Sequence, residues 1–133
     1  MVIQTMATEL PPPTVDRCLA PCPDRPNCVS SLAEDATHRV EPLTFDGSPE
    51  QALKRLRRII EAMRRATVDE VGETYLKASF RSRLFRFTDD LELLVDPRAG
   101  LVHIRSASRV GYSDHGVNRS RVEAIRARYL ATD

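Results

Sequence analysis

The first strong pattern in the chain is helical. Between residues 49 and 63, apolar side chains recur every three or four positions, which is the period of an amphipathic helix with one buried face. The apolar stripe consists of Leu53, Leu56, Ile59, Ile60 and Met63. Ser48 is a preferred N-cap, Pro49 suits the first helical position, and Gln51 completes a capping box. The pattern therefore predicts a helix that begins directly after Ser48.

Beyond residue 73, apolar and polar residues alternate, which is typical of strands. The predicted strands cover residues 74–81, about 85–88, 91–96 and 101–106. The last two form a hairpin closed by residues 97–100, where Gly100 can adopt a positive φ. With Asp96 opposite Leu101, the register pairs Val95 with Val102, Leu93 with Ile104, and Glu92 with Arg105. This register places the apolar pairs on the core side and the charged pair on the other side.

A second helix is predicted to begin near Asn118, which is a favourable N-cap. Val117 can pack against Val122 as a hydrophobic staple. The apolar stripe continues with Val122, Ile125, Tyr129 and Leu130. The fold class that follows is α+β, with an antiparallel sheet of three to four strands and two amphipathic helices packed on one face. A Pro/Cys-rich N-terminal loop precedes them.

Proline content and length divide the chain into an arm and one domain. Residues 1–17, with consecutive prolines at 11–13, predict a flexible N-terminal arm. Residues 18–133 are enough for a single domain, and 41% of the chain is apolar. Residues 18–31 contain three prolines and no periodicity, so no helix is expected there.

Charge and hydropathy narrow the range of partners. The net charge is +1, so no nucleic-acid partner is expected, and the basic face of the first helix is interpreted as a solvated surface. No window approaches the ~20 apolar residues of a membrane span, and the N-terminus has no signal-peptide pattern. The chain is therefore expected to be soluble and cytoplasmic, without a membrane span or a cofactor.

The segment 105–121 contains most of the candidate chemistry, with four arginines, four serines, an Asp, an Asn and two glycines. One interpretation is a pocket for a carboxylate or phosphate group. Arginine offers planar, paired donors to both groups, and a helix N-terminus attracts anions. The candidate ligand-binding residues are Arg105, Ser106, Ser108, Arg109, Asp114, Asn118 and Arg119.

A second interpretation is a buried network in which carboxylates neutralise these arginines and lock the loop to the sheet. The available acids are Asp89, Asp90, Glu92 and Asp114. Asp90 and Glu92 share a strand face and could instead hold Mg²⁺ or act as an acid–base pair, but the neighbouring arginines favour ion pairing. No metal site is predicted. His115 is isolated in sequence and is interpreted as an exposed histidine.

The three cysteines leave several interpretations open. Cys22 and Cys28 are separated by a five-residue loop that could bring them within disulfide range. A reducing cytoplasm favours free thiols. A zinc site formed with Cys18 and a histidine is conceivable, although the spacing matches no common zinc pattern.

Four motifs, in order, resemble the domain of unknown function 1499 family. They cover residues 20–31, 82–92, 105–114 and 116–119, and the resemblance runs from about residue 19 to residue 130. Members are small bacterial or plastid proteins, and no established activity carries over. The resemblance adds supporting positions to the candidate site, namely Asn27, Cys28, Ser30, Ser31, Asp89, Asp90 and Glu92.

The resemblance also implies that residues 27–31 pack against residues 105–119 to form one cleft. There, Cys28 beside Arg109 would be a candidate nucleophile. The expected function is binding of a small anionic ligand in an Arg/Ser-lined cleft. One alternative is a structural or protein-interaction domain whose ion-pair network only locks the fold. Another is an enzyme that uses Cys28 or the acidic group Asp89, Asp90 and Glu92.

Overall fold

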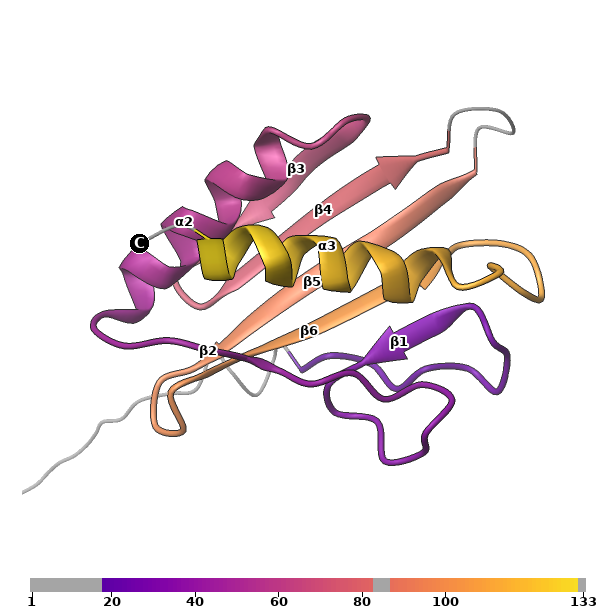
Figure 1. Cartoon of the computed structure of the whole chain (residues 1–133), viewed down its shortest axis with the longest axis horizontal. Helices are drawn as coiled ribbons and strands as arrows, with labels where there is room; N and C mark the ends of the chain where they lie inside the picture. The colour runs from indigo at the N-terminus through magenta and orange to yellow at the C-terminus, as the bar shows by residue number, and fades with distance from the viewer. Residues whose placement is uncertain (1–17, 83–86, 132–133) are drawn as a thin grey trace, which may run out of the picture.

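The computed structural model describes residues 18–82 and 87–131, and within them six antiparallel strands form one sheet (Figure 1). In chain order the elements are β1 (Cys28–Ser30), β2 (Leu43–Thr44), α2 (Pro49–Glu61), β3 (Ala66–Val71), β4 (Tyr75–Arg81), β5 (Thr88–Asp96), β6 (Leu101–Ser108) and α3 (Val117–Ala131). The strand order is β1-β6-β5-β4-β3, and β2 also pairs with β6. The end of β6 therefore lies beside the N-terminal loop.

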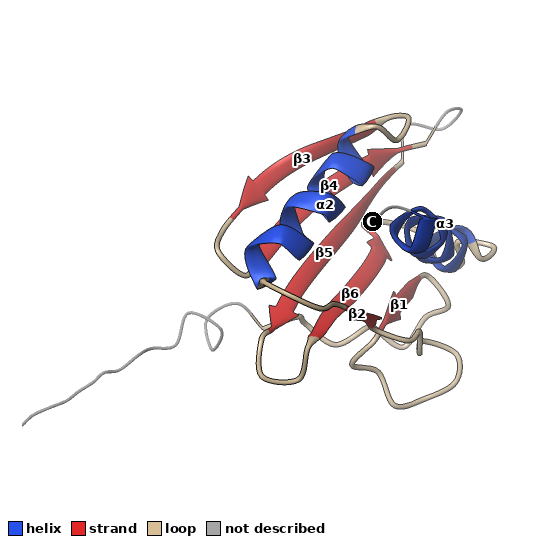
Figure 2. Cartoon of the chain, turned by 60° about the vertical axis from the view of Figure 1, so that its left-hand side comes forward, coloured by secondary structure: helices blue, strands red, loops and turns tan. Residues whose placement is uncertain are grey.

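Both helices cover the same face of the sheet (Figure 2). The apolar stripe predicted for α2 is confirmed for Leu53, Leu56, Ile59 and Ile60, which are buried together with Ala52, whereas Met63 lies beyond the end of the helix and is partly buried. They pack with Val122 and Ile125 of α3 and with apolar side chains of β4, β5 and β6 in one core. Neither helix in the described part of the chain has the length and apolar character that crossing a bilayer requires.

Local sequence signals predict the hairpin and the start of α2 correctly. Asp96 pairs with Leu101, and the pairs that follow from this register are those predicted. Gly100 adopts a φ of 68° in the turn. At the start of α2, Ser48 Oγ accepts the N–H of Gln51 at 3.0 Å. Both features depend on residues close together in the sequence.

The predicted sheet of three to four strands is wrong, because β1, β2 and β3 also belong to it. β1 and β2 contain only three and two residues, too few for an alternating pattern, and β1 lies inside the segment predicted to be a loop. β3 is a polar edge strand with a bulge between Val68 and Glu70. Residues 85 and 86 of the strand predicted near 85–88, and the arm predicted for 1–17, lie outside the described residues, while Thr88 is the first residue of β5.

α3 begins at Val117, so the prediction of Asn118 as its N-cap is wrong. Asp114 caps the helix instead, because its carboxylate accepts the N–H groups of Gly116 at 2.8 Å and Asn118 at 3.1 Å. Val117 is the first helical residue and 47% exposed, which also makes the predicted staple position wrong. Asn118 is fully buried.

Candidate functional site

A disulfide joins Cys22 to Cys28, whose Cα atoms lie 5.6 Å apart. The interpretation that favours free thiols is therefore wrong for these two cysteines, and neither can bind zinc. Cys28 is also only 2% exposed, so its candidate role as a nucleophile does not fit the structure. Among residues 18–82 and 87–131, no group of three or more His, Cys, Asp or Glu side chains is placed to hold a metal ion.

The disulfide loop is hydrogen-bonded to the end of β6 and to the connection between β6 and α3. Asn27 Nδ2 donates to the carbonyl of Gly111 at 2.7 Å. The Asn27 carbonyl accepts the N–H of Ser108 at 2.9 Å, and the Asp114 N–H donates to the Pro26 carbonyl at 3.2 Å. β1 extends this contact by pairing with the end of β6. The packing of this loop against the arginine-rich segment, which the family resemblance implies, is confirmed.

Asn118 is the centre of a buried polar cluster between β6 and α3. Its side-chain amide contacts five polar groups at 2.7–3.2 Å. Its Oδ1 accepts hydrogen bonds from the Ser106 hydroxyl and from Arg121 Nη1. Its Nδ2 donates to Asp114 Oδ2, to Ser108 Oγ and to the Asn27 carbonyl. Asn118 and Ser106 are fully buried, so these contacts replace bonds to water. We call these six residues the polar cluster.

Arg121 belongs to this cluster but was not among the predicted site residues. Its Nη1 lies 2.8 Å from Asp89 Oδ2, and these side chains are only 13% and 12% exposed. Its guanidinium also lies over the ring of Phe80, 4.5 Å from the centroid. Arg121 could have been found from its position three residues after Asn118, because residues with this spacing lie on the same face of a helix.

Arg105 and Arg109 lie on the outer face of the sheet, because side chains alternate along β6. Arg109 donates two hydrogen bonds of 2.9 Å to Asp90, and Lys77 lies 3.5 Å from the same carboxylate. Arg105 lies 3.6 Å from Glu92. Burial alone raises the pKa of Asp90, yet Arg109 and Lys77 hold it below its ordinary value. The predicted ligand-binding residues therefore occupy two faces of the sheet and do not form one cleft.

Arg119 borders a small cavity at the N-terminal end of α3. Its guanidinium donates to the backbone carbonyls of Arg39 at 2.8 Å, Thr37 at 2.9 Å and Ala36 at 3.5 Å. Among the described residues it forms no ion pair. The cavity has a volume of about 150 Å³ and is lined by Pro26, Cys28, Val29, Thr37, Ser113, Asp114, Gly116 and Arg119. No sequence pattern pointed to Thr37.

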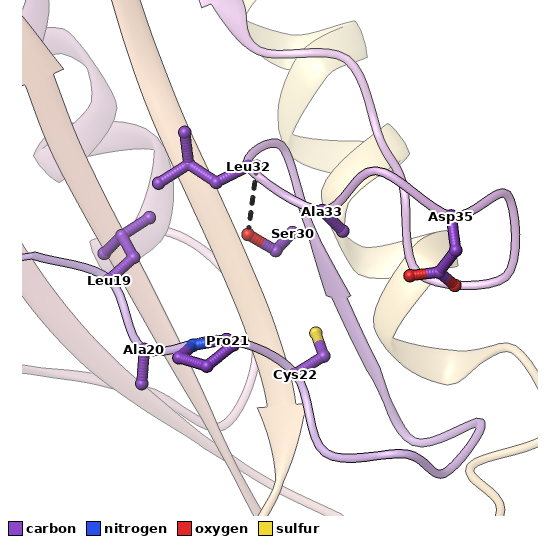
Figure 3. Close-up of a pocket in the computed structure, with 8 residues that line it drawn as sticks. All are labelled: Leu19, Ala20, Pro21, Cys22, Ser30, Leu32, Ala33 and Asp35. Atoms are coloured by element: carbon purple, nitrogen blue, oxygen red, sulfur yellow. Dashed lines mark hydrogen bonds between the residues drawn. The ribbon is translucent and has the colours of Figure 1, made fainter.

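A second cavity, of about 310 Å³, adjoins the other cysteine of the disulfide (Figure 3). It is lined by Leu19, Ala20, Pro21, Cys22, Ser30, Leu32, Ala33 and Asp35. None of these lining residues carries a positive charge, so the lining does not favour an anion. The Ser30 hydroxyl accepts the N–H of Leu32 at 3.1 Å, and the Ser31 hydroxyl accepts the N–H of Ile104 at 2.9 Å. Both predicted supporting serines therefore hold backbone groups.

His38 links the disulfide loop to the segment that follows β1. Its Nδ1 lies 2.7 Å from Asp35 Oδ2, and its Nε2 lies 2.9 Å from the Arg25 carbonyl. Both neighbours are acceptors, so this geometry favours the imidazolium, in which both nitrogens carry a proton. The Arg25 carbonyl raises the pKa of His38; burial opposes this, and the negative charges of Asp35 and Asp24 add to it.

The raised pKa of His38 predicts a pH-dependent stability. The contribution of protonated His38 to the free energy of unfolding is fully present below the pKa of histidine in the unfolded chain, about 6.5. It is lost as the pH rises through the higher pKa of His38 in the folded protein. Relative to a His38→Gln protein, wild type should therefore lose stability from about pH 6.5 upward. Calorimetric melting temperatures of both proteins across this range measure the difference. Parallel pH profiles would show that His38 does not link these segments as an imidazolium.

The comparisons with known proteins connect this arrangement to one family. The chain matches none of the curated proteins with which it was compared. A family model covers residues 18–129, which include the disulfide loop, the polar cluster and all the strands described above. The resemblance carried by the four sequence motifs is thereby confirmed. Because the match spans most of the chain, the protein belongs to the family described as protein of unknown function DUF1499.

Proposed function

We propose that this domain binds a small carboxylate- or phosphate-bearing ligand in the cavity beside Arg119. The observation that carries the proposal is a guanidinium held by three neutral carbonyls, which fix its position without neutralising its charge. By contrast, the other arginines of segment 105–121 each lie within 3.6 Å of a carboxylate oxygen. These are Arg105, Arg109 and Arg121. Among these four arginines, an anion therefore gains most beside Arg119.

The rest of the lining suits a compact anion. Thr37 and Ser113 each bring a hydroxyl to the cavity. Ser113 Oγ accepts the N–H of His115 at 3.2 Å, which leaves its own proton available to a ligand. Asp114 also lines the cavity, and its carboxylate accepts hydrogen bonds from the backbone N–H groups of Gly116 and Asn118 and from Asn118 Nδ2, which occupy its oxygens without cancelling its charge. The site therefore combines one fixed cation with neutral donors and one hydrogen-bonded carboxylate.

A thermal-shift titration with inorganic phosphate and a panel of small carboxylates tests the proposal. A ligand at 100 times its Kd adds about 2.7 kcal/mol to the free energy of unfolding. That corresponds to a rise in melting temperature of about 4 °C or more for a domain of this size. We expect a saturable rise in wild type and none in Arg119→Gln.

Arg126→Gln is the matched control for Arg119→Gln. Arg126 also lies on α3 and donates to backbone carbonyls, those of Glu41 at 2.6 Å and Pro42 at 3.3 Å, but it does not line the cavity. Arg126→Gln therefore loses comparable bonds to backbone carbonyls and, in addition, the ion pair with Glu123 at 3.0 Å. A ligand response lost only in a folded Arg119→Gln protein supports the site. A response lost in both variants, or kept in both, contradicts it.

A second candidate function is a structural or protein-interaction domain in which the motif residues only hold the fold. The polar cluster favours it, as does the pairing of Asp89, Asp90 and Glu92 with arginines. It predicts no saturable response to any anion. The enzyme alternative has less support, since Cys28 is in a disulfide and the pKa of Asp90 is lowered, away from neutrality.

The cytoplasmic location expected from the sequence stays a prediction. The disulfide between Cys22 and Cys28 argues for an oxidising compartment, because cytoplasmic reductants keep most thiols reduced. An oxidising location is compatible with either candidate function.

A further inference from the structure

Exposed apolar side chains gather at one end of the sheet. Phe87, Val110 and Tyr112 are 51%, 56% and 69% exposed. The N–H of Arg109 donates to the carbonyl of Thr88 at 3.1 Å, which brings the start of β5 beside the loop after β6. Figure 1 shows these two chain segments at the same end of the molecule. We call Phe87, Val110 and Tyr112 the apolar rim.

One side of the loop after β6 is open to solvent. Gly111, between two rim residues, has a φ of 93°, and a Cβ built on it meets no atom within 4 Å. Val110 and Tyr112 flank this open position and are themselves more than half exposed. None of the rim residues lines the cavity beside Arg119. An exposed apolar turn suits a deformable partner more than a rigid one with a matching pocket.

Three exposed arginines lie next to the rim. Ser82 and Phe87 exchange hydrogen bonds of 2.8 and 2.9 Å, which places Arg81 beside the rim. The Arg81 N–H donates to the Arg65 carbonyl at 3.1 Å, and Arg65 Nε donates to the Arg81 carbonyl at 3.2 Å. Arg64 precedes this pair. Among the described residues, none of these three arginines forms an ion pair.

We propose that this end of the sheet docks on an anionic phospholipid surface. The rim residues enter the headgroup region, where an aromatic ring with a polar edge, such as Tyr112, is favourable. Arg64, Arg65 and Arg81 face the lipid phosphates, to which their positive charges are complementary. The combination of exposed apolar side chains with arginines that form no ion pair in the described part of the chain distinguishes this surface from the outer sheet face, where Arg105 and Arg109 pair with acids.

Co-sedimentation of the full chain with vesicles tests this docking surface. We expect binding to phosphatidylcholine vesicles that contain about one-third phosphatidylserine, little binding to pure phosphatidylcholine, and weakening by salt. An Arg64→Ser/Arg81→Ser protein should lose about five-fold in partition coefficient per arginine. Val110→Ser/Tyr112→Ser should also bind less. Arg128→Ser/Leu130→Ser, at the opposite end of the molecule, should bind like wild type.

Three outcomes would overturn the proposal. The first is no preference for the anionic vesicles. The second is an equal loss of binding in the Arg128→Ser/Leu130→Ser control, with all variants folded by circular dichroism. The third is a concentration-dependent dimer of the lipid-free protein that Val110→Ser/Tyr112→Ser abolishes, which would assign the rim to a second copy of the chain.

Discussion

An Asn118→Ala protein is expected to lose about 3 to 5 kcal/mol of its free energy of unfolding, with a melting temperature lower by roughly 10 to 20 °C. The substitution removes the amide that joins Ser106, Arg121 and Asp114. Ser106 is fully buried, so water cannot reach it without disturbing the packing of α3 on the sheet. Unfolding in urea, together with thermal melts, measures the loss.

Ser120→Ala is the matched control, because Ser120 lies in the same turn of α3 but is exposed. Its free energy of unfolding should change by less than about 0.5 kcal/mol. Asn118→Asp keeps the shape of the side chain but removes both N–H donors, so it should also be strongly destabilised. If Asn118→Ala and Ser120→Ala unfolded at the same urea concentration, the polar cluster would not be what holds α3 to the sheet.

Reduction of the Cys22–Cys28 disulfide is expected to lower the free energy of unfolding by about 2 kcal/mol. The two cysteines are six residues apart, so the bond restricts a short loop in the unfolded chain. The melting temperature should fall by roughly 6 to 10 °C. Melts with and without reductant, and of a Cys22→Ser/Cys28→Ser protein, measure the effect.

Cys18→Ser is the control for this experiment, because Cys18 is exposed and lies outside the disulfide. It should melt like wild type when oxidised and respond to reductant to the same extent. An unchanged wild-type melt under reducing conditions would show that the bond contributes nothing to stability. A response that Cys18→Ser removes would assign the effect to a different pairing.

The parts of the fold that the sequence predicts correctly depend on short-range signals. Ser48 and Pro49 are sufficient to mark the start of α2, and the β5–β6 register follows from neighbouring residues. β1 could not be predicted in this way, because three residues in a proline-rich segment become a strand only by pairing with distant β6. β3 lies at an edge of the sheet, where a strand needs no continuous buried face.

The sequence predicts which segment contains the candidate residues, but not how their side chains are arranged in space. The two-residue period of β6 separates Arg105 and Arg109 from Ser106 and Ser108, and this separation follows from the sequence alone. The contact between Arg119 and residues 36–39 does not, because it depends on how that loop folds against α3. The state of the cysteines depends on the compartment as well as on their spacing.

The most direct test of the ligand proposal follows backbone amide chemical shifts while inorganic phosphate, and separately succinate, is titrated into the isotope-labelled protein. We expect saturable shifts for Thr37, Ser113, Gly116 and Arg119 with at least one of these anions, and none in Arg119→Gln. Saturable shifts confined to the outer face around Arg105, or no saturable shifts with either anion, would contradict a binding site beside Arg119.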